Sequence, residues 1–243
     1  MTNRAVETSP QVYARIGGVL YLIIIVIGFC GEFFVRDKLV VSGDVTATAN
    51  NIVASESLWR VQIAADLILL VCAVPLTLIL YLLLRPVNKN LALLAVFFNL
   101  VSIAIEGVNA LSHFAPLLIL NGADYLKVFD QHQLQALALL FVNLHAYGFA
   151  ISLTIFSFVL LLEGYLIFNS GYFPKTLGVF VAIAAICYLT NSFALFLAPV
   201  FQAKIFPTIL IPSFIGELSL CLWLLVMGVN VPKWEDKAKR LAG

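Results

Sequence analysis

Polar residues recur at helical spacing inside one long apolar stretch, Asn90–Leu120. Steps of three and four residues return to the same face of an α-helix, so these side chains line one face. The remaining faces are almost wholly apolar and suit lipid or a neighbouring helix. The polar face consists of Asn99, Ser102, Glu106, Asn109 and His113. The pattern predicts a membrane-spanning helix that turns a polar stripe toward the interior of a bundle.

Five further apolar segments of similar length flank this one, separated by short polar turns. About 20 apolar residues are enough to cross the hydrocarbon core of a bilayer as a helix. The sequence therefore predicts an all-α integral membrane bundle of six transmembrane helices, forming a single transmembrane domain over residues 1–243. The expected spans are residues 16–34, 59–84, 91–119, 134–168, 175–198 and 207–230.

Composition supports the membrane class, because 62% of the residues are hydrophobic and only 11% are charged. Soluble domains average about 25% charged residues, which they need for their solvated surface. We expect the lipid bilayer to be the main partner of the chain. The net charge of +1 argues against a nucleic-acid partner, which would require a basic patch.

Short polar segments between the spans carry recognisable helix starts. The first outer loop, Val35–Leu58, is expected to contain a short helix that lies on the membrane surface. Asp44 is its candidate N-cap, and Val45, Ala49, Ile52 and Val53 recur after it at helical spacing. Asp130 and Gln133 have the spacing of a capping box at the start of the fourth span. Residues 1–12 are expected to form a polar N-terminal tail.

The distribution of positive charge predicts the orientation of the chain. Six spans place both termini on one side, and that side carries nine basic residues against five on the other. Cytoplasmic segments carry an excess of Lys and Arg, so we expect both termini in the cytoplasm of a bacterial plasma membrane. The first group is Arg4, Arg15, Arg85, Lys89, Lys175, Lys233, Lys237, Lys239 and Arg240, and the second is Arg36, Lys38, Arg60, Lys127 and Lys204.

Each of the six spans places a polar or ionisable residue in the expected outer half of the bilayer. Such residues are costly in hydrocarbon unless they face a partner or a water-filled cavity. We therefore predict a shared polar pocket that opens outward and binds or transports a small molecule, a lipid or an ion. The candidate ligand-binding residues are Asp66, Glu106, Asn109, His113, His145, Tyr147, Asn191 and Glu217.

Alternatives to a binding pocket follow from the same residues. Protonated Glu106 and Glu217 could instead hold the helices together through hydrogen bonds, as in a structural or accessory membrane subunit. His113 and His145 are also suitable ligand types for a metal or a haem in an intramembrane enzyme. No HExxH, GxSxG, GxxxxGK[ST] or GxGxxG motif is present in the sequence. We therefore predict no catalytic residue, no metal site and no cofactor, and favour a protein that is not an enzyme.

Several local strings together resemble one bacterial membrane family. They are Ala14–Tyr21 (ARIGGVLY), Gly31-Glu32, Leu84–Asn88 (LRPVN), Gly122–Tyr125 (GADY), Leu144–Gly148 (LHAYG) and Gly216–Leu220 (GELSL). The chain resembles the family described as domain of unknown function 4386, from about Ala14 to Asn230. The resemblance implies a six-helix prokaryotic inner-membrane protein and carries over no catalytic residue.

Overall fold

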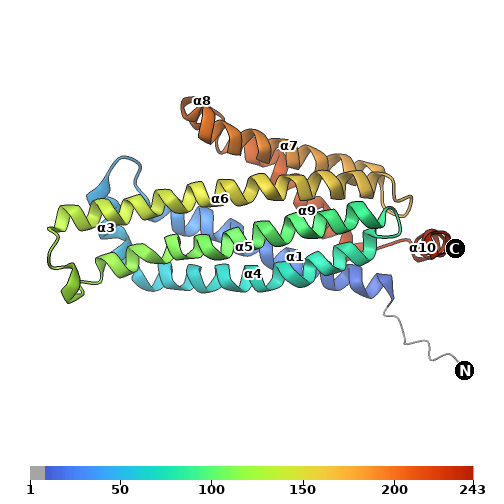
Figure 1. The fold of residues 1–243 in the computed structure, drawn as a ribbon, viewed down its shortest axis with the longest axis horizontal. Coiled ribbons are helices and arrows are strands. Elements are labelled where there is room, and N and C mark those ends of the chain that lie inside the picture. The colour runs from blue at the N-terminus through green and yellow to red at the C-terminus, as the bar shows by residue number, and fades with distance from the viewer. Residues whose placement is uncertain (1–8, 243) are drawn as a thin grey trace, which may run out of the picture. The chain divides into compact units, whose positions relative to one another are not determined.

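The structure is a computed structural model that describes residues 9–242, and its regular elements in that range are all helical (Figure 1). In chain order they are α1 (Pro10–Cys30), the π-helix η1 (Gly31–Arg36), α2 (Asp37–Leu39), α3 (Val45–Ala54), α4 (Glu56–Leu84), α5 (Lys89–Leu120), the 3-10 turn η2 (Asp124–Leu126), α6 (Gln131–Phe168), α7 (Lys175–Leu197), α8 (Pro199–Ile205), the 3-10 turn η3 (Thr208–Leu210), α9 (Ile211–Val226) and α10 (Val231–Ala242).

Six helical segments within residues 9–242 are long and apolar enough to cross a membrane, which confirms the predicted fold class. They are Pro10–Leu39, Glu56–Leu84, Lys89–Leu120, Gln131–Phe168, Lys175–Leu197 and Thr208–Val226. The first helix begins at Pro10, inside the predicted tail, and residues 1–8 of that tail lie outside the described residues. The sixth ends at Val226, four residues before the predicted boundary, and a turn with Gly228 at φ +68° follows.

Local sequence signals place the helix starts as expected. The Asp44 carboxylate accepts a hydrogen bond from the Ala47 amide at 2.8 Å, so Asp44 is the N-cap of α3. Asp130 and Gln133 form the reciprocal capping box, each side chain accepting from the other residue's amide at 2.9 Å. These two caps fix where α3 and α6 begin.

The chain divides into two compact units, and four helices contribute to both. Unit 1 comprises Met1–Leu22, Cys72–Ser102 and Leu153–Gly243, and unit 2 comprises Ile23–Val71 and Ile103–Ser152. The predicted single domain over residues 1–243 remains a prediction. We describe each unit by itself.

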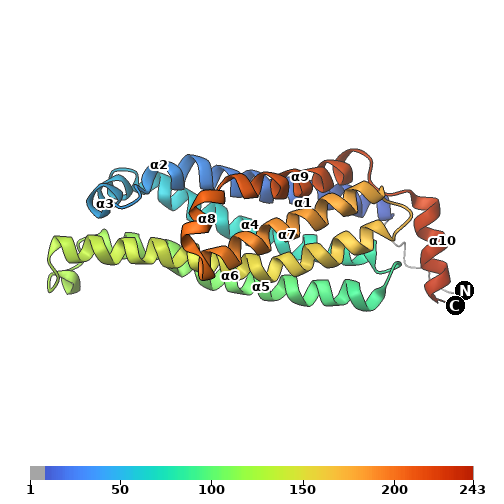
Figure 2. The ribbon, with the colours of Figure 1, turned by 90° about the horizontal axis from the view of Figure 1, so that it is seen from above.

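Unit 1 is packed through small residues that let helix backbones approach closely. α7 lies between α6 and α9 (Figure 2). A Cβ added at Gly164 of α6 would lie 2.8 Å from the Gly178 carbonyl of α7, and one added at Gly216 of α9 would lie 2.9 Å from Ala184. Glycine and alanine at these contacts therefore set the helix spacing, as in other membrane bundles.

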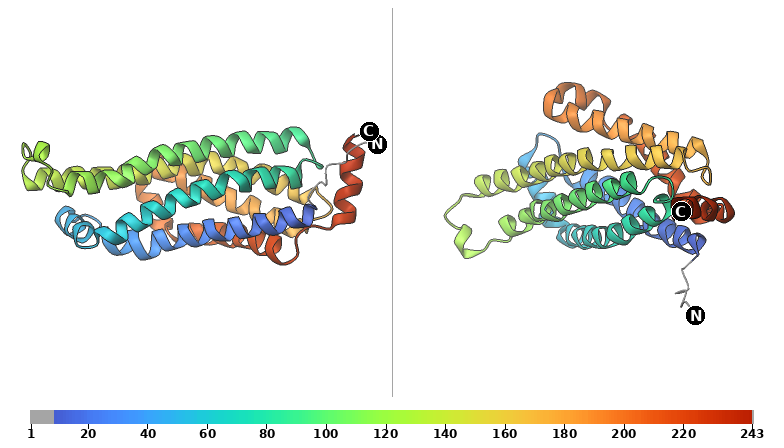
Figure 3. Two further views of the ribbon diagram at one scale, coloured as in Figure 1. Left: turned by 90° about the horizontal axis from the view of Figure 1, so that it is seen from below. Right: turned by 45° about the vertical axis from the view of Figure 1, so that its right-hand side comes forward.

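The C-terminal helix α10 lies across the ends of α4 and α6 in unit 1 (Figure 3). The Trp234 indole donates to the Leu83 carbonyl at 3.0 Å, and the Tyr172 hydroxyl donates to the same carbonyl at 2.7 Å. Lys237 donates to the Asn169 and Ser170 carbonyls at the end of α6. Burial and the nearby Arg240 lower the pKa of Lys237. These donors satisfy carbonyls that a helix end leaves without partners.

Unit 2 has an apolar cluster around α3 and a polar cluster beside it. The apolar cluster contains Val35, Leu39, Ile52, Trp59, Leu117 and Val142. Thr48 of α3 exchanges hydrogen bonds with the Val41 backbone, and the Thr46 hydroxyl donates to Gln135 of α6 at 3.1 Å. The predicted surface helix is thus attached to α6 by specific contacts.

Candidate functional site

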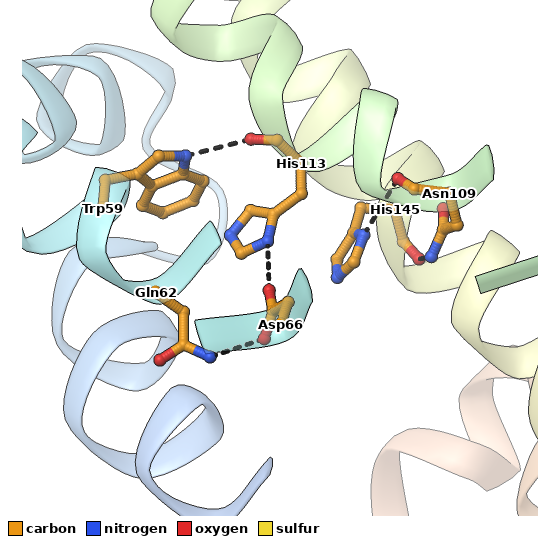
Figure 4. Close-up of polar contacts among 6 residues, drawn as sticks. All are labelled: Trp59, Gln62, Asp66, Asn109, His113 and His145. Atoms are coloured by element: carbon orange, nitrogen blue, oxygen red, sulfur yellow. Dashed lines mark hydrogen bonds and ion pairs between the residues drawn. The ribbon is translucent and has the colours of Figure 1, made fainter. Parts of the chain in front are cut away.

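The polar cluster of unit 2 is assembled from one face of each of three helices (Figure 4). Gln62 and Asp66 are four residues apart on α4, and Asn109 and His113 are four residues apart on α5. Residues at this spacing lie one above the other on a helix surface. His145 comes from α6 and completes the cluster. Helical periodicity alone therefore brings each pair to a common face.

Asp66 and His113 form the central contact of the cluster. The Asp66 Oδ2 atom lies 2.9 Å from His113 Nδ1, and Oδ1 accepts a hydrogen bond from the Gln62 amide at 2.7 Å. The two side chains of the pair are 27% and 12% exposed, respectively. Both oxygens of the carboxyl group are therefore occupied, and the acid orients the imidazole ring through Nδ1.

Trp59 fixes His113 from a second direction. Its indole N–H donates to the His113 carbonyl oxygen at 3.0 Å. The two rings also meet edge to face, with centroids 4.8 Å apart and an angle of 76° between planes. Trp59 is 2% exposed, so this contact holds both the backbone and the ring of His113 in a packed environment.

His145 stacks on the other face of His113. The ring centroids are 4.6 Å apart and the planes differ by 27°. The Asn109 amide donates to the His145 carbonyl at 3.0 Å, and His145 Nδ1 lies 3.4 Å from the Asn109 carbonyl. This reciprocal contact joins α5 to α6 at the level of the stacked rings.

Glu106 extends the cluster one turn along α5. Its carboxyl group hydrogen-bonds to the side chains of Asn109 and Ser152, and it is close enough to Asp66 to interact electrostatically. Its Oε2 atom is buried and has no hydrogen-bond partner. A buried carboxyl oxygen without a partner is costly, so this atom is a candidate position for a ligand or a proton.

Two glycines make room for the amides that hold the cluster. A Cβ at Gly148 of α6 would collide with the side-chain amide of Asn109, and a Cβ at Gly31 would collide with that of Gln62. Gly31 is also the first residue of the π-helix η1. π-Helical turns often occur at functional sites, where they change the direction of a helix locally.

The structure places the eight predicted pocket residues in both units. Unit 2 contains six of them, namely Asp66, Glu106, Asn109, His113, His145 and Tyr147. Tyr147 is 44% exposed and follows His145 by two residues, so it lies on a different face of α6.

The other two predicted residues, Asn191 and Glu217, belong to unit 1 and have hydrogen-bond partners there. Asn191 accepts from the Gln202 amide at 3.1 Å. A pocket shared by all eight residues remains a prediction.

Gln62 and Trp59 were not among the residues predicted for the site. A signal for both existed, because Gln62 precedes Asp66 by four residues and Trp59 precedes it by seven, which is the same face of α4. The pairing of Trp59 and Asp66 with His113 of α5 had no such signal.

The geometry of the histidines bears on the metal and haem alternatives. Within the described part of the chain, no three His, Cys, Asp or Glu side chains converge as metal ligands. His113 and His145 are stacked on each other, and rings 4.6 Å apart leave no space for a porphyrin between them. A haem held by this pair does not fit the arrangement.

A family model described as domain of unknown function (DUF4386) matches residues 16–228. The chain belongs to this family. A similar protein of Archaeoglobus fulgidus, described as an uncharacterized protein, is 27% identical over 167 residues, which cover 69% of this chain and 83% of the relative. No solved structure matches the chain. The DUF4386 match covers five of the six candidate membrane helices in full and the first from residue 16 onward, and it includes residues of both units.

Proposed function

We propose that this DUF4386 protein is an ion-binding membrane protein whose ligand is the proton, bound at the polar cluster of unit 2. The observation that carries the proposal is the direct contact of Asp66 with His113 and of His113 with His145. Histidine changes its charge more readily near neutral pH than any other side chain. An Asp–His–His series inside a membrane protein is thus suited to taking up and releasing a proton.

The packing of the cluster favours a proton over a larger ligand. The rings stack at 4.6 Å and the carboxylate contacts His113 at 2.9 Å, so the side chains already occupy the space between them. A proton requires no additional volume. The other charged groups that act on His145 are Asp66 and Arg36 of η1. Proton uptake would change the electrostatic interactions among these groups.

Protonation has a structural consequence in this geometry. Two imidazolium rings stacked face to face repel each other strongly where the dielectric constant is low. Charging both His113 and His145 would therefore weaken the contact between α5 and α6. This coupling is the physical basis on which the protein would link proton binding to a movement, as a sensor or a transporter of a small molecule, lipid or ion.

Orientation and membrane type belong to the same proposal. The excess of basic residues on the termini and even-numbered loops supports cytoplasmic termini in a bacterial plasma membrane. His113 precedes the end of α5 by seven residues, about 10 Å along the helix. In this orientation that end faces the periplasm, so the cluster would exchange protons with the outside.

Trp59 provides a direct test, because an imidazolium quenches indole fluorescence more strongly than a neutral imidazole does. The emission of wild-type protein minus that of Trp59→Phe isolates the Trp59 signal in detergent. We expect this signal to fall as the pH is lowered and the response to be lost in His113→Gln. His132→Gln, at an exposed position on α6, is the matched control and should respond as wild type does. A Trp59 signal that ignores pH, or one that still responds in folded His113→Gln, would contradict the proposal.

A structural role in an accessory subunit is the second candidate. It is favoured by the Asn109–His145 contact, which joins two helices without requiring any ligand. Under that alternative, Asp66→Asn and His113→Gln change the thermal stability, and the Trp59 fluorescence of the wild-type protein does not depend on pH. The same set of variants therefore separates the two functions.

A further inference from the structure

Unit 1 contains a second group of ionisable side chains, outside the polar cluster of unit 2. Glu217 of α9 accepts a hydrogen bond at Oε2 from the Tyr21 hydroxyl of α1, at 2.9 Å. Its Oε1 atom accepts another from the Tyr188 hydroxyl of α7. Both carboxyl oxygens thus have donors, and the three helices meet at this group.

Glu163 of α6 has a different environment. It is 5% exposed, so its carboxyl group is buried within the unit. Its side chain lines a small cavity of about 10 Å³ together with Thr77, Tyr81, Ala92, Ala95 and Leu166. That volume is roughly the space of one water molecule. An ionisable group is therefore buried beside a space that holds one small ligand.

The two carboxyl groups lack a positive partner. Glu163 and Glu217 are close enough to interact electrostatically, and no described Lys, Arg or His acts on either one. The other titratable groups that face them are Tyr21, Tyr188 and Tyr81. A buried carboxylate without a cation costs several kcal/mol, and two such charges repel each other. At least one of the pair must be neutralised.

We propose that Glu163 and Glu217 form a second proton-binding site, in which Glu163 carries a proton taken from water. Two tyrosine hydroxyls donate to Glu217 and favour its charged form, so Glu163 is the member of the pair that carries the proton. A hard metal cation such as Ca²⁺ gathers six or more oxygen ligands. Besides Glu163, the lining of this cavity offers side-chain oxygens only at Thr77 and Tyr81, fewer than such a cation requires.

This site is independent of the proposed function of unit 2. It rests on different residues and is observed by a different signal, so either proposal can fail alone. If both hold, the protein binds protons in each of its two units.

Infrared spectroscopy of the full-length protein in detergent tests the site, because a protonated carboxyl group has a C=O stretch separate from that of a carboxylate and shifts it in D₂O. We expect the wild-type spectrum near neutral pH, minus that of Glu163→Gln, to contain such a band. Glu235→Gln, at an exposed position on α10, should keep the band. Glutamine has nearly the size of a protonated glutamic acid, so Glu163→Gln should also melt within a few degrees of wild type.

Two results would overturn the proposal. One is a wild-type spectrum without a protonated-carboxyl band, or with a band that Glu163→Gln leaves intact. The other is a melting temperature that rises with NaCl but not with choline chloride at equal ionic strength, with the rise lost in Glu163→Gln. That outcome would assign the cavity to a sodium ion.

Discussion

Gly148→Ala adds a single methyl group at the point where α6 meets the Asn109 side chain. An added Cβ would lie 3.1 Å from Asn109 Nδ2 and closer still to the other atoms of the amide group. The amide must rotate away, since the helix backbone at Gly148 cannot. This rotation removes the hydrogen bond from Asn109 to the His145 carbonyl and the one between Asn109 and Glu106.

The magnitude follows from these two contacts. Leaving a buried hydrogen-bonding group without its partner costs about 1–3 kcal/mol, so two such losses cost about 2–6 kcal/mol. Alanine in place of glycine stabilises a helix by about 0.5–1 kcal/mol. We expect a net loss of about 1–5 kcal/mol. Gly28→Ala is the matched control, because nothing lies within 4 Å of a Cβ at Gly28, and it should be neutral or slightly stabilising.

Unfolding in a mild detergent, followed by circular dichroism, measures both variants. A double-mutant cycle sharpens the test, because the added methyl should cost far less when Asn109 is already alanine. Equal stability of Gly148→Ala and Gly28→Ala would refute the reasoning. So would a cost of Gly148→Ala that is unchanged in the Asn109→Ala background.

Three further predictions concern the rest of the fold. Gly164→Ala forces α6 away from the Gly178 carbonyl and should cost about 1–3 kcal/mol in the same unfolding assay, whereas an unchanged melting temperature would contradict the close contact. Burial raises the pKa of the Tyr172 hydroxyl, so the stability that this neutral hydroxyl contributes is complete below the ordinary pKa of 10.0 and is lost as the pH rises through the raised pKa. Tyr172→Phe removes the hydrogen bond to the Leu83 carbonyl and should lower the free energy of unfolding by about 1 kcal/mol at neutral pH. The variant should also lose less stability at alkaline pH than wild type does, as measured in the same unfolding assay. Asp44→Ala removes the α3 cap, worth about 1 kcal/mol, and should speed hydrogen exchange in α3 alone.

The features predicted correctly from sequence depend on residues close together in the chain. The Asp44 cap involves residues three positions apart, and so does the capping box of Asp130 and Gln133. The six spans depend on length and composition alone. The spacing of Glu106, Asn109 and His113 likewise places the three side chains on one face of α5, whichever residues contact them.

The partners of those residues could not be predicted, because they depend on how one helix is shifted along another. His113 meets Asp66 only through the register of α5 against α4, and neither helix encodes that register in its own periodicity. Contacts between the two helices set this register, such as the hydrogen bond from the Trp59 indole of α4 to the His113 carbonyl of α5. Identifying such contacts requires the packed structure.

The depth of the polar cluster can be judged from the residues around it that face outward. On α4 the exposed positions change from charged Arg60 to apolar Val61, which is 65% exposed. On α6 they change from polar residues 131–133 to apolar Ala136 and then Leu140, which is 52% exposed. An apolar exposed surface is expected where lipid begins.

Asp66 lies six residues beyond Arg60, about 9 Å along α4, and His145 lies nine residues beyond Ala136, about 14 Å along α6. At this depth a charge is costly, yet the polar end of each helix is only two to three turns away. The binding of a proton changes the packing of α5 on α6 only if the added charge is costly, and the proton can be exchanged only if water is near. A cluster at the centre of the bilayer would meet only the first condition, and one in solvent would meet only the second.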